Sequence, residues 1–344
     1  PRLRRQRQMC IRDSRQPAKP SITTTEGKIT LNVEPDLAEI RPVILGAVVR
    51  NVDYTSIGVS ADEFIKSLMD HQEKLHFALG RGRKRASIGV HDLAKLAPPF
   101  TVKAVSGDTK FTPLAATEPM SIKEIMAEHP KGIEYAHLLS EFDRYPIILD
   151  AENNVLSFPP IINGDHTTVT KETKDFFIDV TGWDIRACES SLMLIALQLQ
   201  EYGGIIETVE VTNCFGETNV YPNGSAVEHK LTIAAIQGLL GGKLTEEAIS
   251  GAINRMGGKL VACDDELITL EMPRWRFDIL HPVDLVEDIA IGHGYEDLGH
   301  DIPRSPMTAK PRSDANLLRR VGNSMQGLGT VSYTHLTLPT KSRG

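Results

Sequence analysis

Apolar positions come in short runs over the first part of the chain, and their spacing predicts strands that alternate with helices. Strands are expected at Arg41–Asp53, Phe176–Thr181 and Ile205–Val211, where β-branched and aromatic residues gather. A helix is expected behind Ser60, because Glu63 stands three positions later and the two side chains form a capping box. This alternation indicates a mixed α/β module.

Two long helices are expected in this module. The first carries an apolar stripe with helical spacing and ends at Gly80. The stripe consists of Phe64, Leu68, Leu75 and Leu79. The second helix runs from about Glu189 to Tyr202. Between the two helices, the stretch from Leu156 to Thr173 shows no regular period, and an irregular stretch of this length is typical of a functional loop.

The pattern changes in the later part of the chain. Helices are expected at about Ala226–Leu240 and Thr245–Met256. Two strands follow, Lys259–Cys263 and Leu267–Met272, and they form a hairpin. A further helix is expected at Pro282–His293, because proline suits the first turn of a helix. Two helices followed by a two-stranded hairpin resemble a winged helix, a shape that does not by itself define a function.

These elements predict an α+β chain, in which a mixed α/β module precedes a winged-helix-like module with a β-hairpin wing. The first module, with the segment that leads into it, is placed at residues 22–212 and the second at residues 213–303. A new helical pattern begins within residues 304–330. Residues 1–21 and 331–344 lack a periodic apolar face, and we interpret them as foreign or disordered ends.

Composition narrows the class of protein. The net charge of −7 over 344 residues does not favour nucleic-acid binding through overall charge, so any RNA contact is local or made mainly by a partner chain. The longest apolar stretch, Leu192–Leu199, is too short to span a bilayer. The cysteines form no CxxC pair and are expected to be free thiols: Cys10, Cys188, Cys214 and Cys263. We therefore expect a soluble cytoplasmic protein without a membrane or DNA partner.

Acidic side chains gather at the start of the last predicted helix. The set consists of Asp278, Asp284, Glu287 and Asp288. The three on the helix are three and four positions apart, so they share one face near its N-terminus. Clustered carboxylates with water shells suit Mg²⁺. The alternative is that they complement the helix dipole and pair with Arg274 and Arg276.

Alternation divides the strand Phe176–Thr181 into two faces. The apolar face consists of Phe176, Ile178 and Val180, and the mixed face of Phe177, Asp179 and Thr181. An aromatic ring, a carboxylate and a hydroxyl suit a pocket for a ligand that carries an aromatic ring, in which Phe177 flanks that ring and Asp179 accepts a hydrogen bond from a hydroxyl or amino group of the ligand. Ser157, in the irregular stretch, adds a hydroxyl. The alternative is a solvated strand face on which Asp179 caps a loop.

Three parts of the sequence resemble the beta subunit of archaeal and eukaryotic phenylalanine–tRNA ligases. The first is RGRKRASIGVHDL at Arg81–Leu93. The second combines VLSFPPIINGD at Val155–Asp165 with FFIDVTG at Phe176–Gly182. The third is PRWRFDILHPVDLVEDIAIGHGY at Pro273–Tyr295. Together they lie within residues 22–330 in the family's order.

The resemblance implies an internal part of such a subunit, with an editing module, a winged-helix-like module and the start of a catalytic-like domain at residues 304–330. It implies an alpha subunit as partner, in a heterotetramer of two alpha and two beta chains, and phenylalanine tRNA as ligand. The alpha subunit is expected to hold the ATP-dependent ligase site. The family's editing residues fall on Ser157, Asp179 and Thr181, and its magnesium ligands on Asp278, Asp284, Glu287 and Asp288.

Proofreading has a physical reason. A pocket that accepts phenylalanine through apolar contacts cannot strongly reject tyrosine, which only adds a hydroxyl, so a second site must hydrolyse mischarged tyrosine. No residue is an obvious general base, and we expect a positioned water aided by a tRNA hydroxyl. A free-standing trans-editing hydrolase, and a non-catalytic RNA-binding or structural module, are the alternatives.

Two further patterns are interpreted more simply. The basic run Arg81–Arg85 suggests a solvated face, a contact with an acidic surface or a contact with a tRNA phosphate. His91 and Asp92 are neighbours on a predicted strand and so point to opposite faces, which makes an acid–base pair between them impossible. Both are expected to be structural, with Asp92 capping the next short turn.

Overall fold

The computed structural model describes residues 22–298 and 310–330. The first of these ranges belongs to one unit and the second to another. The segments interpreted as foreign or disordered ends, 1–21 and 331–344, lie outside the described residues.

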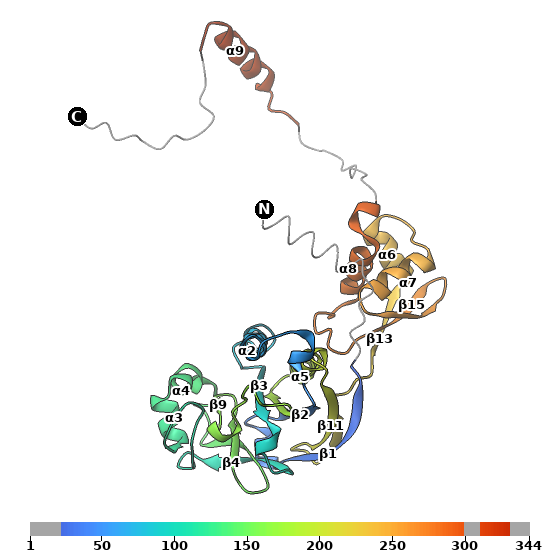
Figure 1. Cartoon of the computed structure of the whole chain (residues 1–344). Coiled ribbons are helices and arrows are strands. Elements are labelled where there is room, and N and C mark those ends of the chain that lie inside the picture. The colour runs from blue at the N-terminus through green and yellow to red at the C-terminus, as the bar shows by residue number, and fades with distance from the viewer. Residues whose placement is uncertain (1–21, 299–309, 331–344) are drawn as a thin grey trace, which may run out of the picture. The chain divides into compact units, whose positions relative to one another are not determined.

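Within residues 22–298, a ten-stranded mixed sheet forms the first module (Figure 1). Its strands lie in the order β3, β10, β2, β11, β1, β4, β7, β8 and β9, and β12 pairs with β11. β1 is parallel to β4 and β11, and the other pairs are antiparallel. The strands are β1 (Thr24–Val33), β2 (Val43–Arg50), β3 (Ala86–Asp92), β4 (Phe100–Ser106), β7 (Arg144–Leu149), β8 (Val155–Phe158), β9 (Ile162–Asn163), β10 (Phe176–Gly182), β11 (Ile205–Thr212) and β12 (Thr218–Tyr221).

The strands β2, β3 and β10 are buried on both faces. Ile178 and Val180 of β10 belong to the apolar core under α2 (Ala61–Ala78) and α5 (Ile185–Glu201), two helices on the same side of the sheet (Figure 1). On the other face of the sheet, the ring of Phe177 belongs to a second apolar cluster and packs against the ring of Phe100. Two-sided burial explains the nearly continuous apolar sequence of β2, and it leaves the polar residues of β3 and β10 to be satisfied inside the protein.

The two long helices begin where side chains cap them. The predicted capping box of Ser60 and Glu63 is present at the start of α2. On α2, Phe64 is fully buried, stacks on Tyr54 and meets two further rings edge-on. α5 begins earlier than predicted, because the carboxylate of Asp184 accepts a hydrogen bond from the Ala187 N–H.

The predicted irregular stretch is folded into short elements. It contains β8, β9 and the 3-10 turn η5 (Asp165–Thr167), and it lies beside β3 and β10. The remaining short elements of the module are η1 (Pro35–Ala38), η2 (Tyr54–Ile57), η3 (Leu93–Lys95), β5 (Lys110–Phe111), β6 (Met120–Ser121), α3 (Ile122–Glu128), α4 (Pro130–Tyr135) and η4 (Ala136–Leu138).

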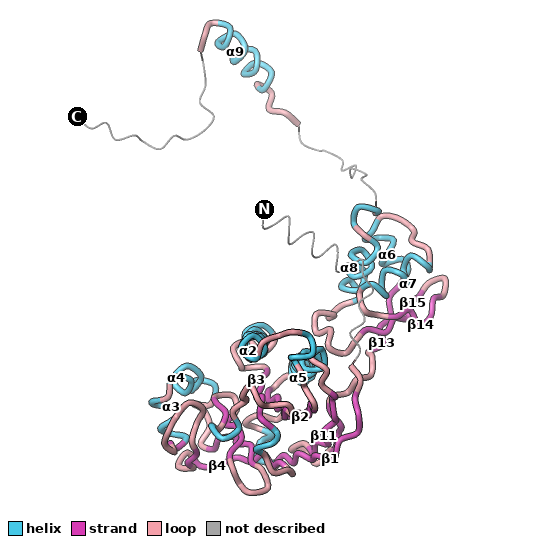
Figure 2. The backbone as a smooth tube through the Cα atoms, in the orientation of Figure 1, coloured by secondary structure: helices cyan, strands magenta, loops and turns pink. Residues whose placement is uncertain are grey.

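Residues 227–298 form the second module, in which the described strands make a three-stranded sheet in the order β13, β15, β14 (Figure 2). The predicted hairpin of β14 and β15 is confirmed, and β13 adds a third strand along β15. The elements are β13 (Val227–Thr232), α6 (Ile233–Leu240), α7 (Glu246–Arg255), β14 (Lys259–Cys263), β15 (Leu267–Met272), α8 (Pro282–His293) and η6 (Tyr295–Asp297).

One prediction about this module is wrong. The helix expected from Ala226 begins only at Ile233, because the preceding residues alternate in polarity and pair as a strand with β15. The stretch Thr218–Tyr221, which lies within the range expected for the second module, pairs with β11 and adds a strand to the large sheet.

The helix α9 (Ala315–Gly327) is the described part of the second unit. It lies in the segment predicted at residues 304–330, of which residues 304–309 fall outside the described residues. Within the described ranges, no helix is both long and apolar enough to cross a membrane.

Helix α2 offers a matched test of core packing. Phe64 is 0% exposed and Phe77, on the same helix, is 81% exposed. Phe64→Ala removes a buried ring and leaves a cavity, so we expect it to lower the free energy of unfolding by about 3–5 kcal/mol. Phe77→Ala should change it by no more than about 0.5 kcal/mol. Urea unfolding followed by circular dichroism measures both, and equal effects would contradict the packing described here.

Candidate functional site

A cavity of about 500 Å³ lies where β3 and β10 meet the folded irregular stretch. Polar side chains from several elements line it, among them Ser157 of β8, Asn163 of β9, Thr167 of η5 and Asp179 of β10. Its volume is typical of small-molecule sites, which are about 300–1,000 Å³. A larger hollow of about 690 Å³ lies along α2 and α5, but the exposed charged side chains of the helix surface line it, among them Glu63, Lys66 and Asp70.

The carboxylate of Asp179 is paired with the imidazole of His91. The distance between Asp179 Oδ1 and His91 Nε2 is 2.6 Å, and the residues are 1% and 0% exposed. In the antiparallel register, Asp179 lies opposite Gly89, and His91 is two residues along β3 on the same face. A Cβ atom on Gly89 would lie 2.1 Å from Asp179 Oδ1 and 2.7 Å from His91 Nε2. Only glycine leaves room for this pair.

The other ring nitrogen of His91 is also engaged. His91 Nδ1 lies 2.8 Å from Thr167 Oγ1, and this hydroxyl lies 2.9 Å from the carbonyl oxygen of Gly164. The chain of contacts therefore runs from the folded loop through the histidine to the carboxylate. No described residue donates a hydrogen bond to the second oxygen, Asp179 Oδ2.

The predicted editing residues have different surroundings. Ser157 lines the cavity together with Asp179, and its hydroxyl lies 3.3 Å from Asn163 Oδ1. Thr181 is fully buried and does not line the cavity. Its hydroxyl accepts a hydrogen bond of 2.8 Å from Arg41 Nε. The structure thus brings two of the three together and sets Thr181 in a separate network.

That network surrounds a buried arginine. Arg41 donates to the hydroxyl and carbonyl of Thr181, to Ser87 Oγ and to the carbonyl of Arg83. Burial lowers the pKa of Arg41 to about 10, partly offset by the negative charges of its surroundings, among them Asp179. The acceptors of these four hydrogen bonds are all neutral.

Phe177 does not flank the cavity as predicted. Its ring is fully buried, and its centroid lies 4.3 Å from that of the Phe100 ring. It packs next to Gly46 on the neighbouring strand β2. The alternative of a solvated strand face is also wrong, because β10 is buried along its whole length. Both expectations fail for one reason: elements distant in sequence cover the second face of β10.

The basic run Arg81–Arg85 contains both buried and exposed side chains. Arg83 is buried, donates to the carbonyls of Pro160 and Ile161 and pairs with Glu73 at 2.9 Å. Its guanidinium lies 4.3 Å from the centre of the Tyr135 ring. Arg83 thus holds the loop that walls the cavity, a role that the charge run alone did not indicate. Arg81 and Lys84 are exposed.

Sequence reasoning missed His91 as a site residue. As predicted, His91 does not pair with Asp92. The carboxylate of Asp92 caps the next short turn, η3, by accepting a hydrogen bond from the Ala94 N–H. The partner of His91 is the carboxylate on the neighbouring strand instead. The available signal was the spacing of Gly89 and His91, which places a glycine and a histidine on one face of β3.

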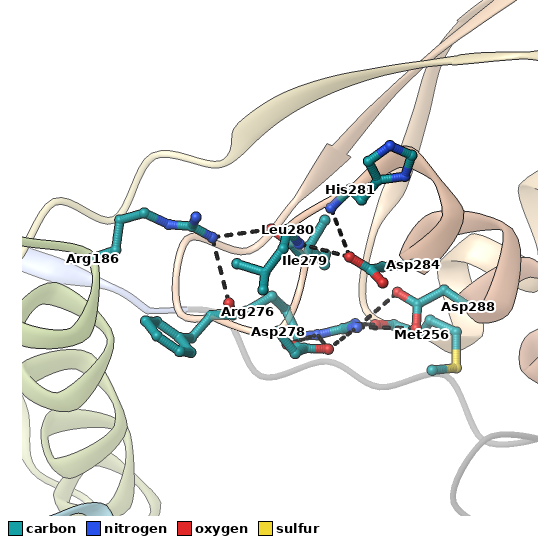
Figure 3. Close-up of polar contacts among 10 residues, drawn as sticks. Arg186, Met256, Arg276, Asp278, Ile279, Leu280, His281, Asp284 and Asp288 are labelled. Carbon is teal, nitrogen blue, oxygen red and sulfur yellow. Dashed lines mark hydrogen bonds and ion pairs between the residues drawn. The ribbon is translucent and has the colours of Figure 1, made fainter. Parts of the chain in front are cut away.

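The predicted magnesium ligands have partners of their own (Figure 3). Arg276 binds Asp278 Oδ2 at 2.6 Å and Asp288 Oδ2 at 2.8 Å. Asp284 Oδ2 accepts hydrogen bonds from the N–H groups of Leu280 and His281 and so caps α8. Glu287 is exposed. Among the described residues, no group of three or more acidic, His or Cys side chains is arranged to hold a metal ion.

Arg276 affects its two carboxylates differently. Its hydrogen bonds lower the pKa of Asp278, whose side chain is 63% exposed. Burial raises the pKa of Asp288, whose side chain is 6% exposed, despite the same guanidinium. In this chain the guanidinium of Arg276 lies between the two carboxylates, as the pairing alternative expects, whereas Arg274 pairs with Glu189 instead.

Family models match both modules. Residues 44–198 match the B3/4 domain, and residues 229–295 match the tRNA synthetase B5 domain.

Curated relatives and a solved structure match most of the chain. The phenylalanine–tRNA ligase beta subunit of Methanosarcina acetivorans is 44% identical over 314 residues, which are 91% of this chain and 56% of the relative. That of Archaeoglobus fulgidus is 36% identical over 94% of this chain and 57% of the relative. The crystal structure of an N-terminal fragment of the phenylalanyl-tRNA synthetase beta subunit from Pyrococcus horikoshii has a TM-score of 0.75 and 32% identity, covering 81% of this chain and 79% of that chain.

Gly89→Ala tests the space beside Asp179. The added methyl collides with the His91–Asp179 contact, so we expect it to destabilise the protein by about 1–3 kcal/mol, as overpacking does. Gly238→Ala is the matched control, since nothing lies within 4 Å of its Cβ position on the exposed side of α6. It should stabilise by up to about 1 kcal/mol, because alanine favours helix. Thermal unfolding compares the two, and a neutral Gly89→Ala would refute the close approach.

Arg276→Met tests the charge cluster. It leaves Asp288 buried without its partner, which typically costs about 3–5 kcal/mol. Adding Asp288→Asn should restore much of the stability, because the unpaired charge is then gone. Millimolar Mg²⁺ should not change the thermal midpoint of the wild-type chain. Saturable Mg²⁺ stabilisation of that chain, measured by calorimetry, would show that the carboxylates form a metal site without a partner.

Proposed function

Because this chain belongs to the family of phenylalanine–tRNA ligase beta subunits, we propose that it carries the editing site that hydrolyses tyrosine mischarged on phenylalanine tRNA. The chain spans about half the length of the curated relatives it matches. Its proposed role is therefore that of two modules within a beta subunit. The cavity beside Asp179 is the proposed editing site.

One observation carries this proposal. Asp179 lines a cavity while His91 holds one of its oxygens, and the other oxygen has no partner among the described residues. Such an oxygen accepts a hydrogen bond from a ligand. Tyrosine and phenylalanine differ by one hydroxyl, and a buried acceptor is satisfied by tyrosine alone. The cavity therefore has the chemistry that an editing site needs.

Hydrolysis of the ester requires a water molecule and a route for its proton. Water attacks the carbonyl carbon, the bond to the ribose oxygen breaks, and tyrosine and free tRNA leave. His91 does not line the cavity and its ring nitrogens contact Thr167 and Asp179, so it does not serve as the base. Ser157 and Asn163 are the polar side chains beside the pocket that suit positioning the water or the ester. A hydroxyl of the terminal ribose is the proposed aid to proton transfer.

The proposed partners are an alpha subunit and phenylalanine tRNA. The ATP-dependent charging reaction is assigned to the alpha subunit, in a heterotetramer of two alpha and two beta chains in the cytoplasm. With a net charge of −7, this chain contributes local contacts to tRNA. Arg81 and Lys84, exposed on the turn behind the buried Arg83, are suitable for a phosphate contact.

Magnesium is proposed at the carboxylate cluster only for the assembled ligase. Arg276 would first have to release Asp278 and Asp288, and Asp284 would have to give up its cap. Magnesium sheds water reluctantly, so isolated carboxylates alone do not drive that exchange. Contact with the alpha subunit is the proposed source of the free energy.

Asp179→Ala in the complex reconstituted with a cognate alpha subunit tests the proposed function. Loss of the acceptor should slow the hydrolysis of tyrosine mischarged on phenylalanine tRNA by at least about tenfold, because a hydrogen bond to a charged group is lost. Phenylalanine charging should survive. Asp62→Ala, at an exposed position of α2, is the control and should leave both reactions unchanged. Undiminished hydrolysis by Asp179→Ala would move the editing site elsewhere.

A further inference from the structure

We propose that His91 is the positioning residue that makes Asp179 a one-sided hydrogen-bond acceptor, so that discrimination between tyrosyl and phenylalanyl ligands depends on the contact chain Thr167–His91–Asp179. This inference rests on the proposed editing function and names the residue that sets its specificity. His91 is 0% exposed and both of its ring nitrogens have protein partners. It does not touch the ligand and acts through Asp179.

The distances define what His91 does. At 2.6 Å, Nε2 and Oδ1 must share a proton, because two lone pairs at this distance repel each other. We assign this proton to His91 Nε2, which donates to the carboxylate. Oδ1 is then occupied, and because Asp179 lines the cavity, we assign Oδ2 as the oxygen that accepts a hydrogen bond from a ligand. The carboxylate presents an acceptor on one side only.

The ring of His91 is held in place by its surroundings. Thr167 Oγ1, itself beside the Gly164 carbonyl, lies 2.8 Å from Nδ1 and orients the ring from the cavity wall. The ring of Phe177 lies at 6.1 Å between centroids on the same face of the sheet. Because Gly89 has no side chain, no atom stands between the ring of His91 and the carboxylate of Asp179. Few degrees of freedom remain for this histidine.

Specificity follows from the charge of the acceptor. A hydrogen bond to an ionised carboxylate is roughly twice as strong as one between neutral groups. Without a donor at Oδ1, this buried oxygen is left without a partner and the carboxylate turns toward another donor. This change weakens the acceptor at Oδ2. A ligand with a phenol then loses its advantage over one with a bare ring.

The test uses two amide-linked probes that the site cannot hydrolyse, 3′-tyrosylamino-3′-deoxyadenosine and its phenylalanyl counterpart. Calorimetry measures their binding to the full chain. The wild type should bind the tyrosyl probe roughly tenfold or more tightly than the phenylalanyl probe, as expected for a charge-assisted hydrogen bond. His91→Leu should reduce this ratio to near one. His91→Gln keeps an N–H donor near the position of Nε2 and should preserve most of the ratio.

His137→Leu is the matched control, because this histidine is exposed and does not line the cavity. It should leave the ratio unchanged. A purely structural role for His91 would weaken both probes equally in His91→Leu. An unchanged ratio in that variant, or no preference in the wild type, would overturn the inference.

A second measurement does not depend on a variant that folds. Two-bond ¹H–¹⁵N correlation spectra of the wild-type chain should show a proton on Nε2 of His91. An unprotonated Nε2 would overturn the inference. Hydrolysis of mischarged tRNA by the wild-type complex separates the two proposals: its absence contradicts the editing function itself, while hydrolysis combined with an unprotonated Nε2 removes only the role of His91.

Discussion

The first module depends on satisfying a carboxylate that is buried in a sheet covered on both faces. An unpaired buried charge is costly, and Asp179 is 1% exposed. His91 on β3 supplies the hydrogen-bond donor, and Gly89 on the same strand leaves the space for it. Thr167, in the loop after β9, orients the ring of His91. A shift of one residue between β3 and β10 would turn His91 to the opposite face. Register, loop and cavity are therefore linked through one pair.

Buried arginines organise the polar contacts around this pair. Arg41 donates to neutral acceptors only, among them the hydroxyl and the carbonyl of Thr181 on β10. Arg83 fastens the cavity loop by its carbonyls and pairs with Glu73 on α2. Such arginines act inside the molecule and not as nucleic-acid contacts. The acidic net charge of −7 and the basic run are compatible for that reason.

The carboxylates before and on α8 show how one acidic pattern serves different purposes. Asp284 caps the helix, while Asp278 and Asp288 share Arg276 (Figure 3). From the neighbouring α5, Arg186 donates to the carbonyls of Phe277 and Ile279, which fixes the loop that carries Arg276 and Asp278 (Figure 3). The guanidinium of Arg276 thus supplies the positive charge that a metal ion would otherwise supply.

The sequence by itself determined the elements whose signals are local: the capping box at Ser60, the hairpin Lys259–Met272 and the helix Pro282–His293. It also determined that Asp179 and Thr181 share a face of β10, since side chains alternate along a strand. Only the tertiary structure decided what covers that face and which partners its side chains meet. His91 and Asp179 are 88 positions apart in the chain, and Arg41 and Thr181 are 140 apart. Pairing between strands brings such residues together, and no local pattern records it.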